Sequence, residues 1–291
     1  MIFSKKLINQ RFLIYKNLPH IKKYPFFSIR NKFANELEAL VKVYLSQNLI
    51  STGKIFKDLK NSIGDIMKLP NITPGGIVVP KIETQLIYNA IASYCYKSLG
   101  DFSKYIKSFA PVTIRVKSGK IKSPDRPYET SKLHSDAWVG MFGDGIISFG
   151  IMGDFKNNGV EFFMPNLISA DYFGKLSNYD EGINKFKGLK EIGRYKKGFI
   201  HLFDNIVLHK TMSKKNSLPR VSIDFGFFLK NKNKASKFFN ADIKRYRFDK
   251  TDVYNECGNN FYYKTFETIT QTRLRLINGK KKVKVPRFVK I

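Results

Sequence analysis

The sequence predicts a mainly β domain of the sandwich or barrel kind, with helices at its N-terminal end. Two observations predict this class. Apolar residues recur with helical spacing in the first third of the chain and then alternate with a period of two in short segments. Turn-forming residues separate these segments at short intervals, as in β-sandwiches and barrels. Because the chain has 291 residues, of which 43% are hydrophobic, it can bury one large core.

Two amphipathic helices are predicted before the strands begin. The first spans 34–47 and the second spans 81–99, and in both the apolar residues recur at i, i+3 and i+4. Between them, 64–80 is rich in Gly and Pro and is predicted to be a loop. Residues 1–32 are basic and aromatic, without a clear period.

Five short strands are predicted in the middle of the chain. In the first of them, apolar residues alternate with Thr113, Arg115 and Lys117, so these three polar side chains share one face. The third strand ends at Pro165, and the fifth is the longest and most apolar. The five segments are 111–117, 145–153, 159–165, 198–204 and 220–230.

We expect one domain over 1–291, built in three parts. A helical N-terminal support spans 1–104, a β core that carries the chemistry spans 105–232, and a basic C-terminal extension spans 233–291. The extension mixes polar, aromatic and basic residues without a clear period.

Cysteine content and hydropathy predict the compartment. Cys95 and Cys257 form no CxxC pair and no disulfide framework, which suits a reducing compartment and excludes a zinc finger. No apolar run is long enough to cross a bilayer, and the N-terminal residues lack the uninterrupted apolar core of a signal peptide. We therefore expect a soluble, cytoplasmic protein.

The net charge of +29 has two explanations. It indicates either a polyanionic partner, such as a nucleic acid, or the lysine-rich composition that an AT-rich genome produces. Most of the 52 basic residues are lysine, whereas nucleic-acid readers rely on arginine for contacts to base edges. We expect a small-molecule partner, for which an anionic group would fit the charge, and the charge leaves nucleic acid open.

The stretch SKLHSDAWVG holds half of a candidate metal site. His134 and Asp136 share a face if they lie on a strand, because side chains alternate with period two. His209, at the edge of a later strand, is the candidate third ligand; its rival His201 lies inside an apolar strand, where we expect it to pack in the wall. Two histidines and one carboxylate that leave other metal positions open are typical of non-haem Fe(II) oxygenases.

Arg220 opens the fifth strand, where an unpaired charge would be costly. Its planar guanidinium suits the far carboxylate of a dicarboxylate cosubstrate that chelates the metal. Ser222 shares the strand face of Arg220, and Thr211 lies two residues after His209, so both are candidates for further hydrogen bonds to the cosubstrate. Arg115 is a further candidate for binding a carboxylate, unless its face of the strand is solvated.

The order H-x-D, then a distant His, then Arg-x-Ser resembles that of the Fe(II)/2-oxoglutarate-dependent dioxygenases, and within them the phytanoyl-CoA dioxygenase-like branch. The stretches KKGFIHLFDNIVLHKTMSKKNSLPRVSIDF and NNGVEFFMPN also resemble that branch. The resemblance implies a double-stranded β-helix, that is, a jelly-roll or cupin-like barrel, supported by the N-terminal helices. It also implies Fe(II) held by His134, Asp136 and His209, 2-oxoglutarate held by Arg220, and O₂ as a reactant.

The activity implied is hydroxylation of an unactivated C–H bond in a polar small molecule, either sugar-like or an intermediate of natural-product synthesis. Two alternatives stay open: an oxygenase that modifies a nucleic acid or a protein, and a non-catalytic barrel-type binding protein.

Three further side chains are candidates for the substrate pocket. Trp138 either lines the pocket or packs in the core, because an aromatic ring suits both. Glu161 and Asp224 are candidate polar groups of the same pocket. Asp204 and Asn205 are expected to form a turn.

Overall fold

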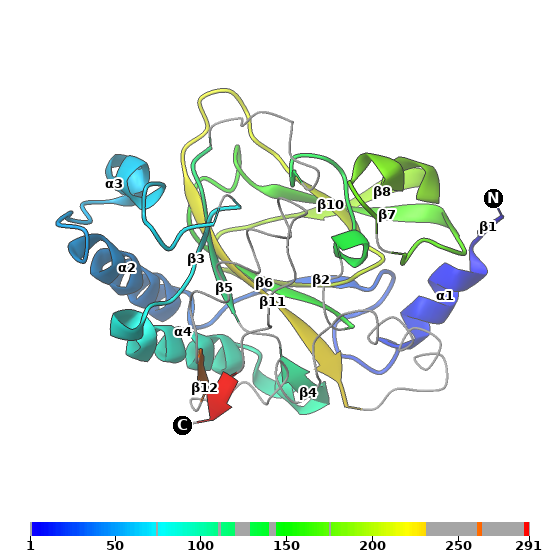
Figure 1. Cartoon of the computed structure of the whole chain (residues 1–291). Coiled ribbons are helices and arrows are strands. Elements are labelled where there is room, and N and C mark those ends of the chain that lie inside the picture. The colour runs from blue at the N-terminus through cyan, green and yellow to red at the C-terminus, as the bar shows by residue number, and fades with distance from the viewer. Residues whose placement is uncertain are drawn as a thin grey trace.

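The predicted mainly β class with flanking helices is confirmed (Figure 1). The computed structural model describes residues 2–73, 75–109, 112–119, 129–139, 144–174, 176–230, 261–263 and 288–290. Most of the predicted C-terminal extension therefore lies outside the described residues. Among the described residues, no helix combines the length and the hydropathy that a membrane span requires.

The two predicted helices are present as α2 and α4, and both are longer than three turns. The helix α3 begins before the predicted loop 64–80 and ends within it, so the start of that segment is helical. Asp58 caps the first turn by accepting a hydrogen bond from the backbone N–H of Asn61. The α-helices are α1 (Lys6–Leu13), α2 (Ala34–Ile50), α3 (Leu59–Ile66) and α4 (Gln85–Ser98). The 3₁₀ turns are η1 (Ile82–Thr84), η2 (Gly100–Tyr105), η3 (Asp136–Val139) and η4 (Asp180–Lys185).

The described strands pair antiparallel throughout. The larger sheet has the order β2-β9-β6-β11-β5-β3, with β4 also on β11; the smaller sheet has the order β1-β7-β10, with β8 also on β7. The larger sheet contains β2 (Phe26–Arg30), β3 (Ile77–Val78), β4 (Ile106–Phe109), β5 (Thr113–Lys117), β6 (Gly145–Gly153), β9 (Phe199–Asp204) and β11 (Arg220–Leu229). The smaller sheet contains β1 (Phe3–Ser4), β7 (Val160–Ser169), β8 (Phe186–Arg194) and β10 (Leu208–Thr211). Separately, β12 (Phe261–Tyr263) pairs with β13 (Phe288–Lys290).

Two expectations about the strands were wrong, and one strand was missed. The N-terminal support is not only helical, because it also supplies β1 to the smaller sheet and β2 and β3 to the larger one. The strand that was expected to end at Pro165 continues to Ser169, since Pro165 still pairs with Leu189 of β8. The strand β8 was not predicted, because most of its residues are exposed and it therefore has no apolar alternation.

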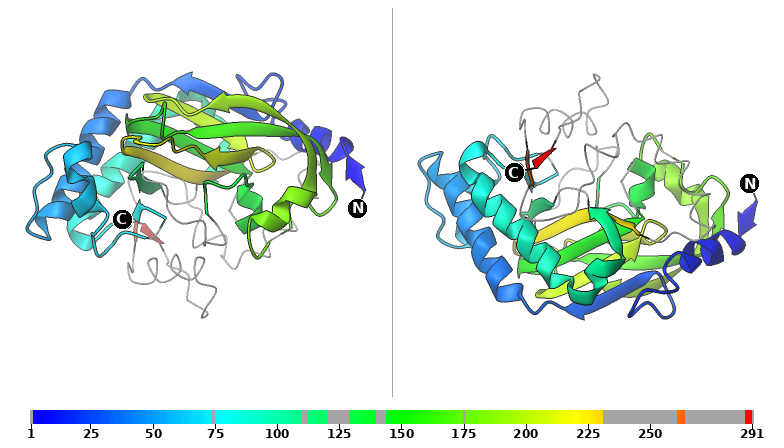
Figure 2. Two further views of the ribbon diagram at one scale, coloured as in Figure 1. Left: turned by 90° about the horizontal axis from the view of Figure 1, so that it is seen from above. Right: turned by 90° about the horizontal axis from the view of Figure 1, so that it is seen from below.

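The helices α2 and α4 lie across one face of the larger sheet (Figure 2). The apolar residues of β5, Ile114 and Val116, are fully buried in the core between this face and the helices. The alternating polar residues of β5 therefore point to the other face, toward the smaller sheet. This arrangement gives the space between the two sheets a polar wall.

A buried ion pair attaches α1 to the end of β9. The guanidinium Nε of Arg11 lies 2.7 Å from Oδ2 of Asp204, and both side chains are buried. Asp204 also accepts a hydrogen bond from the backbone N–H of Ile206 at 2.7 Å. The expectation that Asp204 only forms a turn was therefore incomplete, since its second oxygen compensates a charge that comes from a distant helix.

Candidate metal centre

His134 and His209 lie beside each other because their backbones are hydrogen-bonded. The N–H of His134 donates to the carbonyl of His209 at 2.9 Å, and the N–H of His209 donates to the carbonyl of His134 at 2.8 Å. Two residues on, the N–H of Thr211 donates to the carbonyl of Thr130 at 2.6 Å. The segment 130–134 thus extends the smaller sheet beyond β10 and brings the two halves of the candidate site together.

Asp136 lies beside the two histidines, but it is positioned by a different element than expected. It does not share a strand face with His134, because it begins the 3₁₀ turn η3. The hydroxyl of Ser135, between them, donates to the carbonyl of Asn205 and accepts from the backbone N–H of Ala137 at 3.1 Å. This turn, not the pleat of a strand, aims the carboxylate at the two imidazoles.

Three potential ligand atoms meet in this region. One nitrogen of each imidazole and one oxygen of Asp136 all lie within 4.8 Å of one another, and the described residues contain no other such group of three. Nε2 of His209 lies 3.5 Å from Oδ2 of Asp136. Adjacent ligands of one ion, each about 2.1 Å from it, stand about 3 Å apart. The three residues fit a divalent metal after a small closing movement.

The backbone contacts of the two histidines involve Nδ1, which leaves Nε2 of each ring available to bind a metal. Nδ1 of His134 donates to the carbonyl of Lys132 at 2.7 Å, and Nδ1 of His209 points at the carbonyl of Val207 at 3.5 Å. A carbonyl can only accept, so the proton of His134 lies on Nδ1 and its Nε2 offers a lone pair. This arrangement, with one ring nitrogen tied to the backbone, is common among metal-binding histidines.

Burial sets the charge states at the site. It lowers the pKa of His134 well below its ordinary value, and the neighbouring His209 lowers this pKa further, so His134 is a neutral imidazole. Burial raises the pKa of Asp136, although His209 opposes the shift. A carboxylate that burial destabilises as an anion is stabilised by a bound cation. The neutral imidazole of His134 and the buried carboxylate of Asp136 therefore both suit a metal.

Arg220 is a buried cation without an anionic partner among the described residues. Its side chain is 1% exposed, Nη1 donates to the hydroxyl of Ser222 at 3.0 Å, and Nε has no hydrogen-bond acceptor. No carboxylate among the described residues lies within ion-pair distance of it. The rings of Phe155 and Tyr195 lie 5.7 and 5.5 Å from its central carbon. Burial lowers the pKa of Arg220 to about 10, which shows that the fold alone does not compensate the charge.

Arg115 has the counter-ion that Arg220 lacks. Its Nε lies 3.0 Å from Oδ2 of Asp224, and the hydroxyl of Thr113 donates to the same carboxylate. These residues face one another across the pairing of β5 with β11. The expectation that Arg115 binds a cosubstrate carboxylate is thereby weakened, because Asp224 already neutralises its charge. Asp224, expected as a pocket residue, fixes this arginine on the wall.

Trp138 does not line a pocket. Its side chain is fully buried, and its Nε1 donates to the carbonyl of Tyr172 at 2.8 Å. The core alternative for this residue is the correct one, because the ring fills the space behind η3. His201 is also buried, and the ring of Phe162 packs against both His201 and His209, with centroids 6.0 and 6.1 Å away. His201 is therefore a wall residue and not the third ligand.

Two tyrosines at the site were not predicted from the sequence as site residues. The ring of Tyr179 stacks on His134, with centroids 4.1 Å apart and planes inclined by 18°. The ring of Tyr195 lies between Arg220 and His201, 4.7 Å from the latter. Both follow segments without apolar periodicity, so only a contact between distant parts of the chain reveals them.

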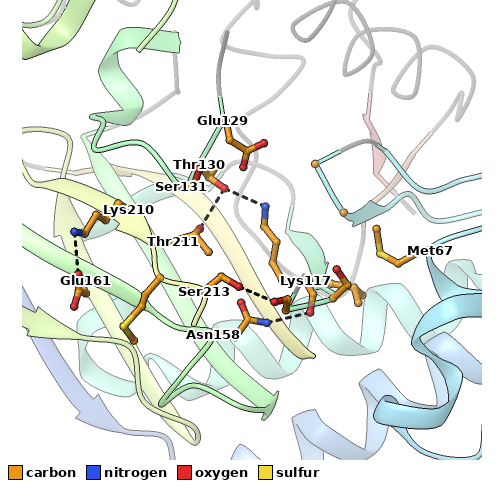
Figure 3. A pocket seen from close by; sticks show the side chains of 16 residues that line it. Met67, Lys117, Glu129, Thr130, Ser131, Asn158, Glu161, Lys210, Thr211 and Ser213 are labelled. Carbon is orange, nitrogen blue, oxygen red and sulfur yellow. Dashed lines mark hydrogen bonds and ion pairs between the residues drawn. The ribbon is translucent and has the colours of Figure 1, made fainter. Parts of the chain in front are cut away.

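A cavity of about 300 Å³ opens beside the β10 end of the site (Figure 3). It is not lined by the three candidate ligands; Thr211, two residues after His209, connects it to them. Nζ of Lys117 donates to the hydroxyl of Thr130 at 3.0 Å, and the hydroxyl of Thr211 donates to the same oxygen at 3.2 Å. Glu161 also lines the cavity, where it pairs with Lys210 at 3.3 Å. The lining is mostly hydroxyl-bearing and charged.

No protein-family model matches the chain, and no relative is found among curated proteins. Similar solved structures include EctD from S. alaskensis with 2-oxoglutarate and 5-hydroxyectoine, at 13% identity and a TM-score of 0.40, covering 72% of this chain and 77% of that one. The non-heme alpha ketoglutarate dependent carbocyclase SnoK from nogalamycin biosynthesis has 8% identity and a TM-score of 0.44, covering 77% and 83%. The epimerase SnoN from the same biosynthesis has 11% identity and a TM-score of 0.36, covering 76% and 82%. These three structures are similar to this chain only at TM-scores below 0.5, so the function proposed below rests on the residues of the site.

Proposed function

We propose that this protein is an Fe(II)- and 2-oxoglutarate-dependent oxygenase that acts on a polar small molecule. One observation carries the proposal: a buried arginine, without a counter-ion among the residues that the structure describes, stands on the sheet opposite a cluster of two histidines and one aspartate. A metal site and an unmet cation on facing walls suit one ligand that is both a chelator and an anion. 2-Oxoglutarate has both properties.

The donor set favours ferrous iron. Two imidazole nitrogens and one carboxylate oxygen, with the remaining positions open, are the ligands of non-haem Fe(II) oxygenases. When bound, iron would supply the oxidation of a C–H bond by O₂, coupled to conversion of 2-oxoglutarate into succinate and CO₂. His134 and His209 would bind it through Nε2, and Asp136 through one carboxylate oxygen.

The other residues bind and orient. Arg220 would hold the far carboxylate of 2-oxoglutarate with its Nε–H, the donor that has no acceptor in the fold. Ser222 keeps that guanidinium in place through the hydrogen bond to Nη1. Thr211 shares the face of His209 and adds a hydroxyl between metal and cavity. Tyr195 covers the guanidinium and excludes water from it.

The cavity beside the site supports a polar substrate. Its volume of about 300 Å³ suits a small molecule, and its lining includes five hydroxyl-bearing and four charged side chains beside apolar ones. We further propose that the two sheets form a double-stranded β-helix and that the whole chain is one domain. The cytoplasmic location stays a prediction.

Anaerobic titration of the protein with Fe(II) and then with 2-oxoglutarate tests the proposal. We expect one metal ion per chain, and binding of 2-oxoglutarate that requires both the metal and Arg220. A substrate screen that measures succinate then identifies the class of acceptor, with polymers included to test a nucleic-acid or protein substrate. Failure to bind either ligand would instead support a non-catalytic binding protein.

A further inference from the structure

We propose that Tyr179 and Asp180 form a two-point clamp on the first histidine of the metal centre, which makes Tyr179 a positioning residue for metal binding. Both residues belong to the long connection between β7 and β8, far along the chain from His134. The inference rests on the proposed function, because it takes His134 to be a metal ligand.

The first point of the clamp is the ring of Tyr179. It stacks on one face of the His134 ring at 4.1 Å, and the ring of His209 lies 4.2 Å away, tilted by 54°. Both His134 and Tyr179 are buried, at 2% and 3% exposure. Rotation of the imidazole out of its plane would break the stack and place a polar ring edge against an aromatic face. The stack therefore fixes the plane of the ring, and the hydrogen bond from Nδ1 to the carbonyl of Lys132 opposes the in-plane flip that would exchange Nδ1 and Nε2.

The second point is the carboxylate of the next residue. Oδ2 of Asp180 lies 2.5 Å from Nζ of Lys132, and the carbonyl of Lys132 accepts the Nδ1–H of His134 at 2.7 Å. Consecutive residues of one connection thus hold both the ring of His134 and the group that fixes its tautomer. Contacts of this kind behind a ligand typically change metal affinity by about 10- to 100-fold.

The connection is itself held firmly. Trp138 lies behind Tyr179, with ring centroids 6.5 Å apart, and donates to the carbonyl of Tyr172. A Cβ added at Gly182 would lie 2.1 Å from Cζ3 of Trp138, so only glycine permits this close approach. Trp138 belongs to the same turn as Asp136. The clamp is therefore formed before the metal arrives, and the ordering cost of His134 does not weaken binding.

Anaerobic titration with Co(II), followed by its visible absorption, tests the clamp without measuring activity. We expect Tyr179→Leu to weaken cobalt binding by about tenfold or more, and Tyr179→Phe, which keeps the ring, to change it by less than about threefold. Asp180→Asn should weaken binding by about three- to tenfold. Its matched control is Asp171→Asn, which removes the same charge from the same connection but affects contacts with Lys185 and Ser169 instead of the pair with Lys132.

The variants at Asp180 and Asp171 keep the test decisive if Tyr179→Leu fails to fold, because their side chains are 60% and 55% exposed. Equal cobalt affinity in the parent, Asp180→Asn and folded Tyr179→Leu would overturn the clamp while leaving the metal site standing. An equal loss in Asp171→Asn would overturn it too, since charge alone would explain the effect. A parent protein that binds no cobalt would refute the proposed function itself.

Discussion

Replacing Arg220 by Met should make the protein without ligands more stable and remove its affinity for 2-oxoglutarate. Methionine has a similar length and no charge, so it fills much of the same space. The prediction follows from the burial of a guanidinium that has no carboxylate partner among the described residues. A residue kept at a cost in stability is one that a ligand must compensate.

The magnitude can be estimated from the site. Burial lowers the pKa of Arg220 to about 10. Compared with a free guanidinium, this shift corresponds to a cost of about 3 kcal/mol at every pH below 10. Methionine removes that cost but also loses the contacts with the rings of Phe155 and Tyr195 and the hydrogen bond to Ser222, together about 1 to 2 kcal/mol. We expect a net gain of about 1 to 2 kcal/mol, which is a rise of a few degrees in Tm.

Binding should change in the opposite direction. Removing one partner of a buried charge pair costs about 2 to 5 kcal/mol, so the Kd for 2-oxoglutarate should rise at least about thirtyfold. Metal affinity should not change, because Arg220 does not contact His134, Asp136 or His209. Thermal unfolding with and without 2-oxoglutarate, together with calorimetric titration, measures both quantities.

Arg115→Met is the matched control. This arginine lies on the same face but pairs with Asp224 at 3.0 Å. Its loss leaves a partly buried carboxylate without its cation, so it should destabilise the fold by about 1 to 3 kcal/mol. The two replacements are therefore expected to change the free energy of unfolding in opposite directions. If Arg220→Met is instead the less stable of the two, or binds 2-oxoglutarate as the parent does, the reasoning is refuted.

Three other predictions concern the metal site and the fold. Asp136→Ala should abolish stoichiometric metal binding, measured by metal analysis after dialysis, because only the two imidazole nitrogens of the site remain as ligands; an unchanged stoichiometry would exclude the site. Burial lowers the pKa of His201 to about 3, so the unfolded chain takes up the proton first as pH falls, and this residue should contribute at most about 1.4 kcal/mol per pH unit to a decline in stability below about pH 6.5, in addition to the contribution of His134. His201→Gln should flatten that decline in pH-dependent denaturation, and an equally steep decline would assign it to other groups. Arg11→Met should lower the free energy of unfolding by about 3 to 5 kcal/mol, because it leaves the carboxylate of Asp204 buried without its cation; a loss below about 1 kcal/mol in urea denaturation would show that Asp204 is protonated in the fold.

The local patterns that the sequence carries were sufficient for part of the fold. The apolar residues that the periods predict to be buried are largely so in α2 and β5, because each period reports which face of one element avoids water. In α4 the period was a poorer guide, since Leu86 is 85% exposed whereas Asn89 and Ser93 are buried. The exposed strand β8 and the short β1 and β2 have no such period, so no local pattern could reveal them.

By its residue types alone, the chain determined which chemistry is available: two histidines, an aspartate and an arginine, in an order and spacing that suit a metal and an anion. Tertiary structure decided what each group meets. It gave Arg115 a partner and left Arg220 without one, turned Asp136 toward the histidines through η3, and placed Tyr179 on His134. These contacts join side chains from separate elements, and the free energy of such a contact depends on distance and burial in the folded chain, which no periodicity along the sequence records.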